Sequence, residues 1–170
     1  MTDIEHFSWQ DHQVIANALA RYCHLIDSGR VARLFEEIFA PDAVLDYGGE
    51  PLRDPAAQRA LFSIADGRDD VTAHFIGSIA IEGHGAGARS VCYFQSWRWE
   101  PECAIFGRIR AADMVGIGQY IDEWKQTDRG WRIAHRRLEP VGGGPLALGR
   151  PLEVVGRLYA DRVRGDGPAR

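Results

Sequence analysis

The feature that most restricts the fold of this chain is a change of hydrophobic period near Val71. Before this point, apolar residues recur every three to four positions, the spacing of one helix face. From Val71 to Glu82 the side chains alternate with a period of two, which is typical of a long β-strand. A helical half followed by long strands predicts an α+β fold in which helices cover one face of a curved antiparallel sheet.

Three helices are predicted in the first half. Ser8 is a suitable N-cap, and Asp11 three residues later completes a variant of the capping box. The second helix stops before Pro41, because proline disfavours helix in the residue before it. Asp54 followed by Pro55 is a typical start for the third. The predicted helices cover about residues 9–26, 31–39 and 55–65, with a short strand over 43–47.

The second half is predicted to contain four long strands, at about residues 71–82, 88–99, 115–126 and 131–138. A glycine-rich hairpin loop joins the first two strands, and an Asp-Arg-Gly turn joins the last two. We expect the main domain to span residues 1–141. The tail, residues 142–170, is expected to begin with a flexible Gly-Gly-Gly-Pro joint. A helix over 152–163 would follow, as a possible lid or oligomer contact.

Composition limits the partners of the chain. The 170 residues carry a formal net charge of −4 and no basic stripe, which argues against nucleic acid or anionic membrane as partner. No apolar run is long enough to span a membrane, and no signal peptide is visible. The three cysteines form no Cys-x-x-Cys pair, which favours a reducing cytoplasm.

The end of the first helix, Arg21 to Gly29, contains a carboxylate in an unfavourable place. Asp27 lies at the carbonyl end of the helix, where the partial charge of the backbone is negative. One explanation is that Asp27 or Ser28 caps the next helix. The other is that Asp27 has a functional role, because residues that cost stability are often retained for function.

The histidines do not form a metal-binding pattern. His74 lies in the middle of the first long strand, on its more polar face. Such a position can face solvent. It lines a concavity instead if the helices cover the other sheet face and the sheet curls. The alternation does not choose between these two faces.

Four segments carry a resemblance to a known family: Arg21-Tyr22-x4-Asp27-Ser28-Gly29, Leu34-Phe35-x3-Phe39-Ala40-Pro41-Asp42-Ala43, Thr72-x-His74-Phe75-Ile76-Gly77, and the segment from Gln126 to Arg136. They resemble the SnoaL-like domains, which belong to the cone-shaped α+β nuclear transport factor 2-like superfamily. The resemblance covers about residues 8–140. A fold of this kind carries many unrelated functions, so the resemblance is specific for fold and weak for substrate.

The resemblance extends to three enzyme families: scytalone dehydratase, bile-acid 7α-dehydratase and hexachlorocyclohexane dehydrochlorinase. It implies that Asp27 and His74 form a catalytic pair inside the cone, with Tyr22 as a further catalytic residue. Tyr47 and Arg136 match positions that contact substrate in these enzymes. Relatives often carry a polar group in the part of the second long strand where this chain has Trp97. Trp97 is therefore a candidate substrate contact, and the replacement of the polar group argues against a simple dehydration.

We therefore expect a cofactor-independent lyase or isomerase, such as a dehydratase, double-bond isomerase or polyketide cyclase. Its substrate would be a small hydrophobic cyclic molecule, and no metal or organic cofactor is required. His74 would act as the base and Asp27 would orient it. The alternatives are a non-catalytic small-molecule-binding cone and an accessory subunit of a larger enzyme. The resemblance also implies a homo-oligomer, either a dimer or a trimer.

Overall fold

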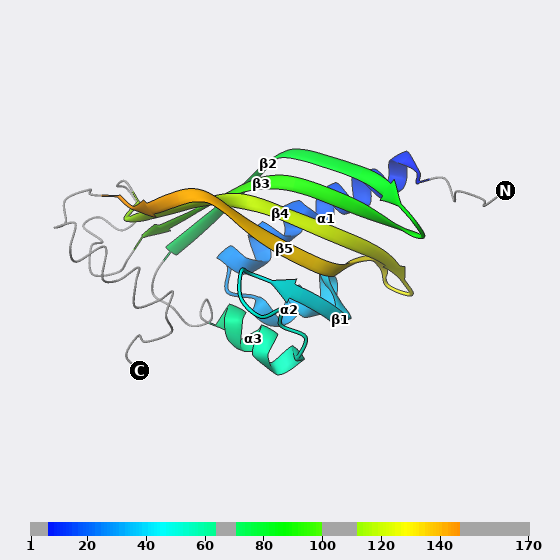
Figure 1. The fold of residues 1–170 in the computed structure, drawn as a ribbon, viewed down its shortest axis with the longest axis horizontal. Coiled ribbons are helices and arrows are strands. Elements are labelled where there is room, and N and C mark those ends of the chain that lie inside the picture. The colour runs from blue at the N-terminus through cyan, green and yellow to red at the C-terminus, as the bar shows by residue number, and fades with distance from the viewer. Residues whose placement is uncertain (1–6, 64–70, 100–111, 147–170) are drawn as a thin grey trace.

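The computed structural model describes residues 7–63, 71–99 and 112–146. Its described part consists of three helices and a five-stranded sheet with the strand order β1-β5-β4-β3-β2. In Figure 1, α1 lies along one face of the sheet, and α2, α3 and β1 lie together at one side. The elements are α1 (Trp9–Asp27), α2 (Val31–Glu37), β1 (Phe39–Asp46), α3 (Pro55–Ser63), β2 (Val71–His84), β3 (Gly87–Trp99), β4 (Met114–Thr127) and β5 (Gly130–Pro145).

The three predicted helices and four long strands are confirmed, together with the predicted caps. Ser8 Oγ accepts from the Asp11 backbone N–H at 3.1 Å, while the Asp11 carboxylate accepts from the Ser8 N–H at 3.0 Å. Asp54 likewise accepts from the Ala57 N–H at 2.9 Å. These contacts satisfy backbone donors that have no partner within their own helix.

The first strand of the sheet differs from the prediction. β1 begins at Phe39 and contains Pro41, where the sequence pattern predicts only the end of a helix, and it runs parallel to β5. The sheet is therefore mixed rather than wholly antiparallel. Proline is tolerated here because β1 is an edge strand whose register with β5 is interrupted between Phe39 and Val44.

The inner face of the sheet, which packs on α1, carries the core. Alternate residues of β3 and β4 point to this face and are buried: Ala88, Ser90, Cys92, Phe94, Gly118, Tyr120, Asp122 and Trp124. The pairing of Ile76 with Phe94 places the first part of β2 in the same alternation, so Thr72, His74 and Ile76 share the inner face. α1 packs directly against β2. His74 therefore lies on the helix-covered face of the sheet.

The alternation of β2 does not continue through the strand as the sequence suggests. The register with β3 shifts between Gly77 and Ala80, and Ser78 has a positive φ of 50°. Such a bulge inserts an extra residue and exchanges the two faces. Ile81 consequently pairs with Ser90 and packs against the core, whereas Ile79 is exposed.

β5 extends further than predicted. Residues 142–145, expected to form a flexible joint, continue the strand and pair with β4. A glycine is required within this segment because Gly143 has a φ of 124°, and a Cβ there would lie 2.4 Å from the Val115 carbonyl oxygen. The predicted tail helix over 152–163 lies outside the described residues.

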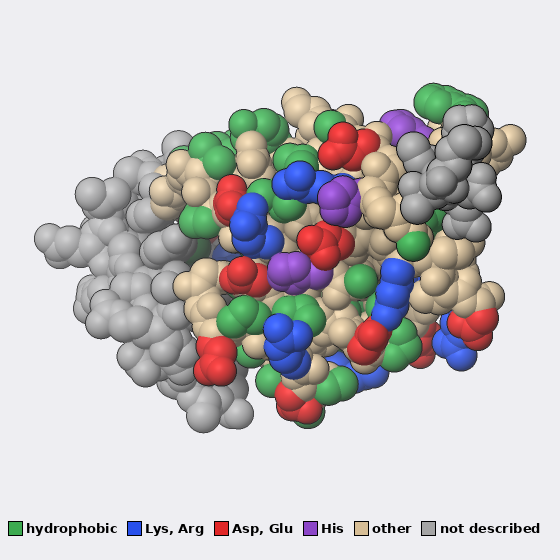
Figure 2. Space-filling view, turned by 45° about the vertical axis from the view of Figure 1, so that its right-hand side comes forward, with side chains coloured by type: hydrophobic (Ala, Val, Ile, Leu, Met, Phe, Trp, Pro, Cys, Tyr) green, Lys and Arg blue, Asp and Glu red, His purple; other side chains and the backbone are tan. Residues whose placement is uncertain are grey.

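The surface seen in Figure 2 carries acidic and basic side chains interspersed over the described part of that face. Exposed large apolar side chains include Phe75 and Tyr93. These two residues lie on the outer face of the sheet, which alternates with the core-facing one. Among the helices of the described residues, none is long and apolar enough to cross a membrane.

Candidate active site

The helix end that carries Asp27 is shaped by the residues that follow it. Gly29 adopts a φ of 66°, a conformation that commonly ends helices, and the Arg30 N–H donates to the Leu25 carbonyl at 2.9 Å. Ser28 Oγ donates back to the His24 carbonyl at 2.7 Å. The next helix has Arg30 as its N-cap and no side-chain cap. Asp27 and Ser28 therefore do not cap α2, which removes the purely local explanation of Asp27.

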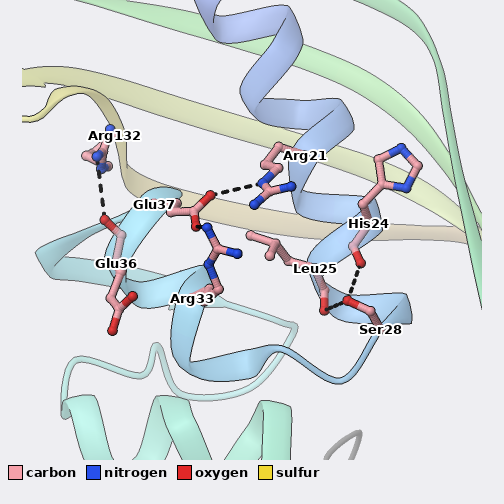
Figure 3. Close-up of polar contacts among 8 residues, drawn as sticks. All are labelled: Arg21, His24, Leu25, Ser28, Arg33, Glu36, Glu37 and Arg132. Carbon is pink, nitrogen blue, oxygen red and sulfur yellow. Dashed lines mark hydrogen bonds and ion pairs between the residues drawn. The ribbon is translucent and has the colours of Figure 1, made fainter.

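Polar contacts on the other side of α1 attach this helix end to α2 (Figure 3). Arg21 Nε donates to Glu37 Oε2 at 2.9 Å, and Arg33 forms a second ion pair with Glu37. The hydrogen bond from Arg21 and the nearby positive charges hold the pKa of Glu37 below its usual value. Arg132 also donates to the Glu36 carbonyl of α2. These contacts link α1 to α2 and α2 to β5 at the surface of the molecule.

Asp27 faces β2 and accepts hydrogen bonds from two of its residues. Its Oδ1 lies 2.5 Å from His74 Nδ1 and accepts from Thr72 Oγ1 at 3.1 Å. Its Oδ2 accepts from the His74 backbone N–H at 2.8 Å. Hydrogen bonds to charged groups contribute about 1.5–3 kcal/mol each. The carboxylate is therefore held at both oxygens, and the predicted pairing of Asp27 with His74 is present in the structure.

The His74 ring is positioned for proton transfer at its second nitrogen. The carboxylate next to Nδ1 can only accept, so Nδ1 is assigned as the donor and Nε2 as the acceptor. Within the described residues, no group hydrogen-bonds Nε2. The His74 side chain retains 12% of its surface exposed and that of Asp27 24%, so the pair is not sealed in the core. This geometry suits a base whose tautomer is fixed by a carboxylate.

Thr72 was missed by the sequence reasoning. It holds the same carboxylate oxygen as His74 Nδ1 and comes from the same strand face, two residues earlier. The signal was present in the sequence, because residues i and i+2 of a strand point to the same side. A threonine hydroxyl beside a proposed catalytic histidine could have been included on that ground.

A second polar group lies deeper in the core and contains Tyr22 and Arg136. Arg136 is fully buried, and its Nε and Nη2 donate to Asp122 Oδ1 and Oδ2 at 2.7 and 2.8 Å. Its guanidinium carbon lies 4.3 Å from the ring centre of Tyr22 and 4.1 Å from that of Tyr120. Phe94 stacks on Tyr120 with ring centres 4.2 Å apart. We call Tyr22, Tyr47, Tyr120, Asp122 and Arg136 the tyrosine–arginine cluster.

The electrostatics of the tyrosine–arginine cluster keep its tyrosines neutral. Burial raises the pKa of Tyr22, Tyr47 and Tyr120 well above the usual value, and neighbouring tyrosines add to this effect. Burial alone would lower the pKa of Arg136, but the Asp122 carboxylate outweighs it and the net shift is upward. The tyrosines are thus hydrogen-bond donors at neutral pH, and the charges of Arg136 and Asp122 cancel.

Two polar atoms of this cluster remain open. Arg136 Nη1 and the Tyr47 hydroxyl are buried and make no hydrogen bond of good geometry within the described residues. The Tyr47 hydroxyl nevertheless lies beside the Tyr22 hydroxyl, and a hydrogen-bond contact of poorer geometry between them adds to the rise in the pKa of Tyr47, so Arg136 Nη1 is the more clearly open of the two atoms. Leaving a buried donor unsatisfied costs about 1–3 kcal/mol. Such atoms in a native structure call for an explanation, often water or a ligand.

The structure brings the predicted site residues together only in part. Tyr22 and Arg136 contact each other and not the Asp27–His74 pair, because α1 stays helical through Asp27 and directs the two side chains differently. Trp97 pairs with Ala73 on the outer face of the sheet, and its Nε1 donates to Gln95. It therefore lies on the opposite sheet face from His74.

Asp122 is the second residue that sequence reasoning missed. It lies in β4 on the buried face between Tyr120 and Trp124. A charged residue in the apolar register of a strand is a signal of a buried partner. Arg136 of β5 is that partner, directly opposite in the sheet. In the described ranges, no three His, Cys, Asp or Glu side chains are grouped closely enough to hold a metal ion.

Comparison with known protein families identifies the class of this protein. The model of the SnoaL-like domain matches residues 8–137, most of the chain, so the chain belongs to the SnoaL-like domain family. The solved structures with a similar fold include nuclear transport factor 2-like proteins. No functionally curated protein matches the sequence.

Solved structures show the same fold at low sequence identity. The Kfla4162 protein of Kribbella flavida is 21% identical, with 79% of this chain and 93% of that chain covered and a TM-score of 0.68. A protein of Novosphingobium aromaticivorans, provisionally assigned as a scytalone dehydratase, is 17% identical, with coverages of 89% and 99% and a TM-score of 0.68. A nuclear transport factor 2-like protein of Salmonella enterica is 15% identical, with coverages of 78% and 92% and a TM-score of 0.64.

Proposed function

We propose that this protein is a cofactor-independent lyase or isomerase that acts on a small hydrophobic cyclic substrate. The observation that carries the proposal is the 2.5 Å contact between Asp27 Oδ1 and His74 Nδ1, with Nε2 left open. In this arrangement Nε2 accepts a proton from carbon, and Asp27 stabilises the imidazolium that forms. In a dehydration the proton goes to a hydroxyl that leaves as water when its C–O bond breaks. In a double-bond shift it goes to another carbon, and in a cyclisation it goes to the carbonyl oxygen of the carbon that the new C–C bond joins.

Apolar and aromatic side chains separate the two polar groups. Ile76 and Phe94 lie between His74 and Tyr120 on the inner face of the sheet. Gly116 of β4 is aligned across the sheet with Ser96 and His74. Tyr120 is four residues further along β4, which is about 13 Å at the usual rise of a strand. A hydrophobic ring system suits such a lining. Tyr22 and Tyr47 are then neutral donors for an oxygen at the end of the substrate remote from His74.

The proposal is tested by hydrogen exchange at a carbon acid of the proposed substrate class. β-Tetralone, a small bicyclic ketone, is incubated with the protein in D₂O, and loss of its α-hydrogens is followed by NMR. We expect the protein to accelerate exchange, and His74→Asn to remove about 10²–10⁴-fold of that acceleration, the usual contribution of a general base. The asparagine keeps an amide donor for Asp27 and removes the imidazole ring.

His24→Asn is the matched control, because His24 is an exposed histidine on α1. Its exchange rate should equal that of the unmodified protein. Equal rates for His74→Asn and the unmodified protein would contradict the catalytic role. Binding of β-tetralone without any exchange would instead favour a non-catalytic binding cone.

A further inference from the structure

A row of three residues on the inner face of the sheet runs across the strands from the proposed base. His74 of β2 pairs with Ser96 of β3, and Ser96 pairs with Gly116 of β4. Residues directly opposite each other in neighbouring strands point to the same face, so all three belong to the face that α1 covers. Neighbouring strands are about 5 Å apart, which places the Gly116 backbone roughly 10 Å from that of His74. The row therefore ends at a position without a side chain.

This row lies at the edge of the buried core. Ser96 and Gly116 are half-buried, whereas Phe94 and Gly118, which form the neighbouring row of the same two strands, are buried. The His74 side chain likewise keeps 12% of its surface exposed. A ligand in contact with the His74 ring can therefore lie against this part of the sheet without displacing core residues.

The fold itself does not require a glycine at position 116. At Gly118 a Cβ would lie 2.6 Å from the Phe94 ring and 2.7 Å from the Glu139 carbonyl oxygen, so a side chain is excluded there. Gly116 has no positive φ, and among the described residues only the Ser96 hydroxyl oxygen lies within 4 Å of its Cβ position, at 2.8 Å. A serine hydroxyl can move away by rotation about χ1. Packing thus explains the glycine at 118 but not the one at 116.

We propose that Gly116 is a specificity-determining residue that sets the width of the site across the strands, and with it the size of the ring system on which His74 can act. This inference rests on the proposed function, since it places the reacting carbon at His74 Nε2. A first ring in contact with Nε2 leaves the space over Ser96 and Gly116 for a second, fused ring. The flat face of that ring can approach the backbone at Gly116 closely because no Cβ intervenes.

A side chain at position 116 would occupy this space and restrict the substrate to a single ring. Gly116 acts through shape alone and takes no part in the proton transfer. The competing explanation is that Gly116 eases the curvature of β4, as glycines in bent strands often do. A glycine of that kind would affect stability and all substrates alike.

The test compares β-tetralone, which has two fused rings, with cyclohexanone, which has one. Exchange of their α-hydrogens in D₂O is followed by NMR, and the affinity for each ketone is measured by titration calorimetry with the full chain. For Gly116→Val we expect exchange and affinity for β-tetralone to fall by about tenfold or more, the usual effect of one or two carbons that a pocket cannot accommodate. The values for cyclohexanone should stay the same.

Two further variants complete the comparison. Gly116→Ala adds one methyl group and should give the same selectivity with a smaller loss, so it decides the question if Gly116→Val does not fold. Gly77→Val is the matched control, because Gly77 lies on the outer face of the sheet and no described atom is within 4 Å of its Cβ position. It should leave both ketones unaffected.

The inference is overturned if neither variant at Gly116 weakens β-tetralone binding, if both ketones lose affinity equally, or if neither ketone binds the unmodified protein. Equal losses would indicate that Gly116 serves the curvature of the strand. These failures are separable from failure of the proposed function. Exchange that depends on His74 but not on the residue at 116 leaves the reaction standing. A selective loss of β-tetralone affinity without any exchange leaves a binding site whose width Gly116 sets.

Discussion

Two acid–base pairs occupy the inner face of this sheet, and they differ in burial and in what they leave open. Asp122 and Arg136 are fully enclosed, and both carboxylate oxygens are taken by one partner. Asp27 and His74 retain part of their surface, and the His74 Nε2 has no partner in the described residues. The first pair comprises two charged groups that cancel. The second contains an imidazole ring, one nitrogen of which is held by the carboxylate while the other is left as an acceptor.

The depth at which a carboxylate–base pair is buried therefore determines whether it serves the stability of the fold or a reaction. A carboxylate and a base deep in the core must compensate each other completely, because water cannot. Near the end of α1 the same kind of pair can remain partly unsatisfied without a large cost. The polar group suited to reaction is therefore the less buried one, while the deeper one offers fixed donors.

The largest expected difference between the pairs is in stability. Asp122→Ala leaves the buried Arg136 charge unpaired and should lower the free energy of unfolding by about 3–5 kcal/mol. Asp27→Ala removes a partly exposed carboxylate and should cost clearly less. Urea unfolding of both variants, followed by circular dichroism, measures the two losses. Equal losses would show that the two pairs do not differ in the way their burial suggests.

A smaller effect is expected at Thr72, which helps to hold Asp27. Thr72→Val removes one hydrogen bond to Oδ1 and should slow β-tetralone exchange roughly tenfold, the value of about one such bond. Thr72→Ser keeps the hydroxyl and should restore most of the rate. A role in packing alone would predict the reverse order, because valine preserves the shape of threonine better than serine does.

The smallest effect concerns a third carboxylate, Asp11, which is mainly structural. Hydrogen bonds from Ser8 and then from Trp131 Nε1 hold the pKa of Asp11 below its usual value. A lowered pKa in the folded state stabilises the protein above the unfolded pKa, and this stability is lost as pH falls through the folded value. Asp11→Asn should cost about 1 kcal/mol at pH 7, and the cost should fall progressively as the pH is lowered below 3.8, as measured by thermal unfolding. An equal cost across this pH range would show that the charge of Asp11 contributes nothing.

Local pattern in the sequence predicted most of the elements of the fold. The capping residues Ser8 and Asp54 and the period change at Val71 each reflect physics within a few residues, and the structure agrees with them. The parallel pairing of β1 and the bulge at Ser78 depend on long-range packing instead. Uninterrupted apolar alternation through Ile79 and Ile81 gave no sign that the strand exchanges its faces there.

The candidate site could be predicted to a lesser extent. Asp27 and His74 are 47 positions apart, so their contact followed from the family resemblance and not from any spacing. α1 stays helical through Asp27, so Tyr22 and Asp27 lie on different sides of the helix. Trp97 was expected to contact the substrate, but strand alternation directs it to the outer face. The positions of these side chains depend on how α1 lies across the sheet, which a sequence pattern does not encode.

The central claim is that Asp27 acts through His74, and a double-variant cycle on β-tetralone exchange in D₂O tests it most directly. Exchange rates are measured for the unmodified protein, Asp27→Asn, His74→Asn and the double variant. Residues that act as a unit give non-additive losses, so we expect the double variant to exchange no more slowly than His74→Asn alone. Independent, additive losses of the two substitutions would contradict the account.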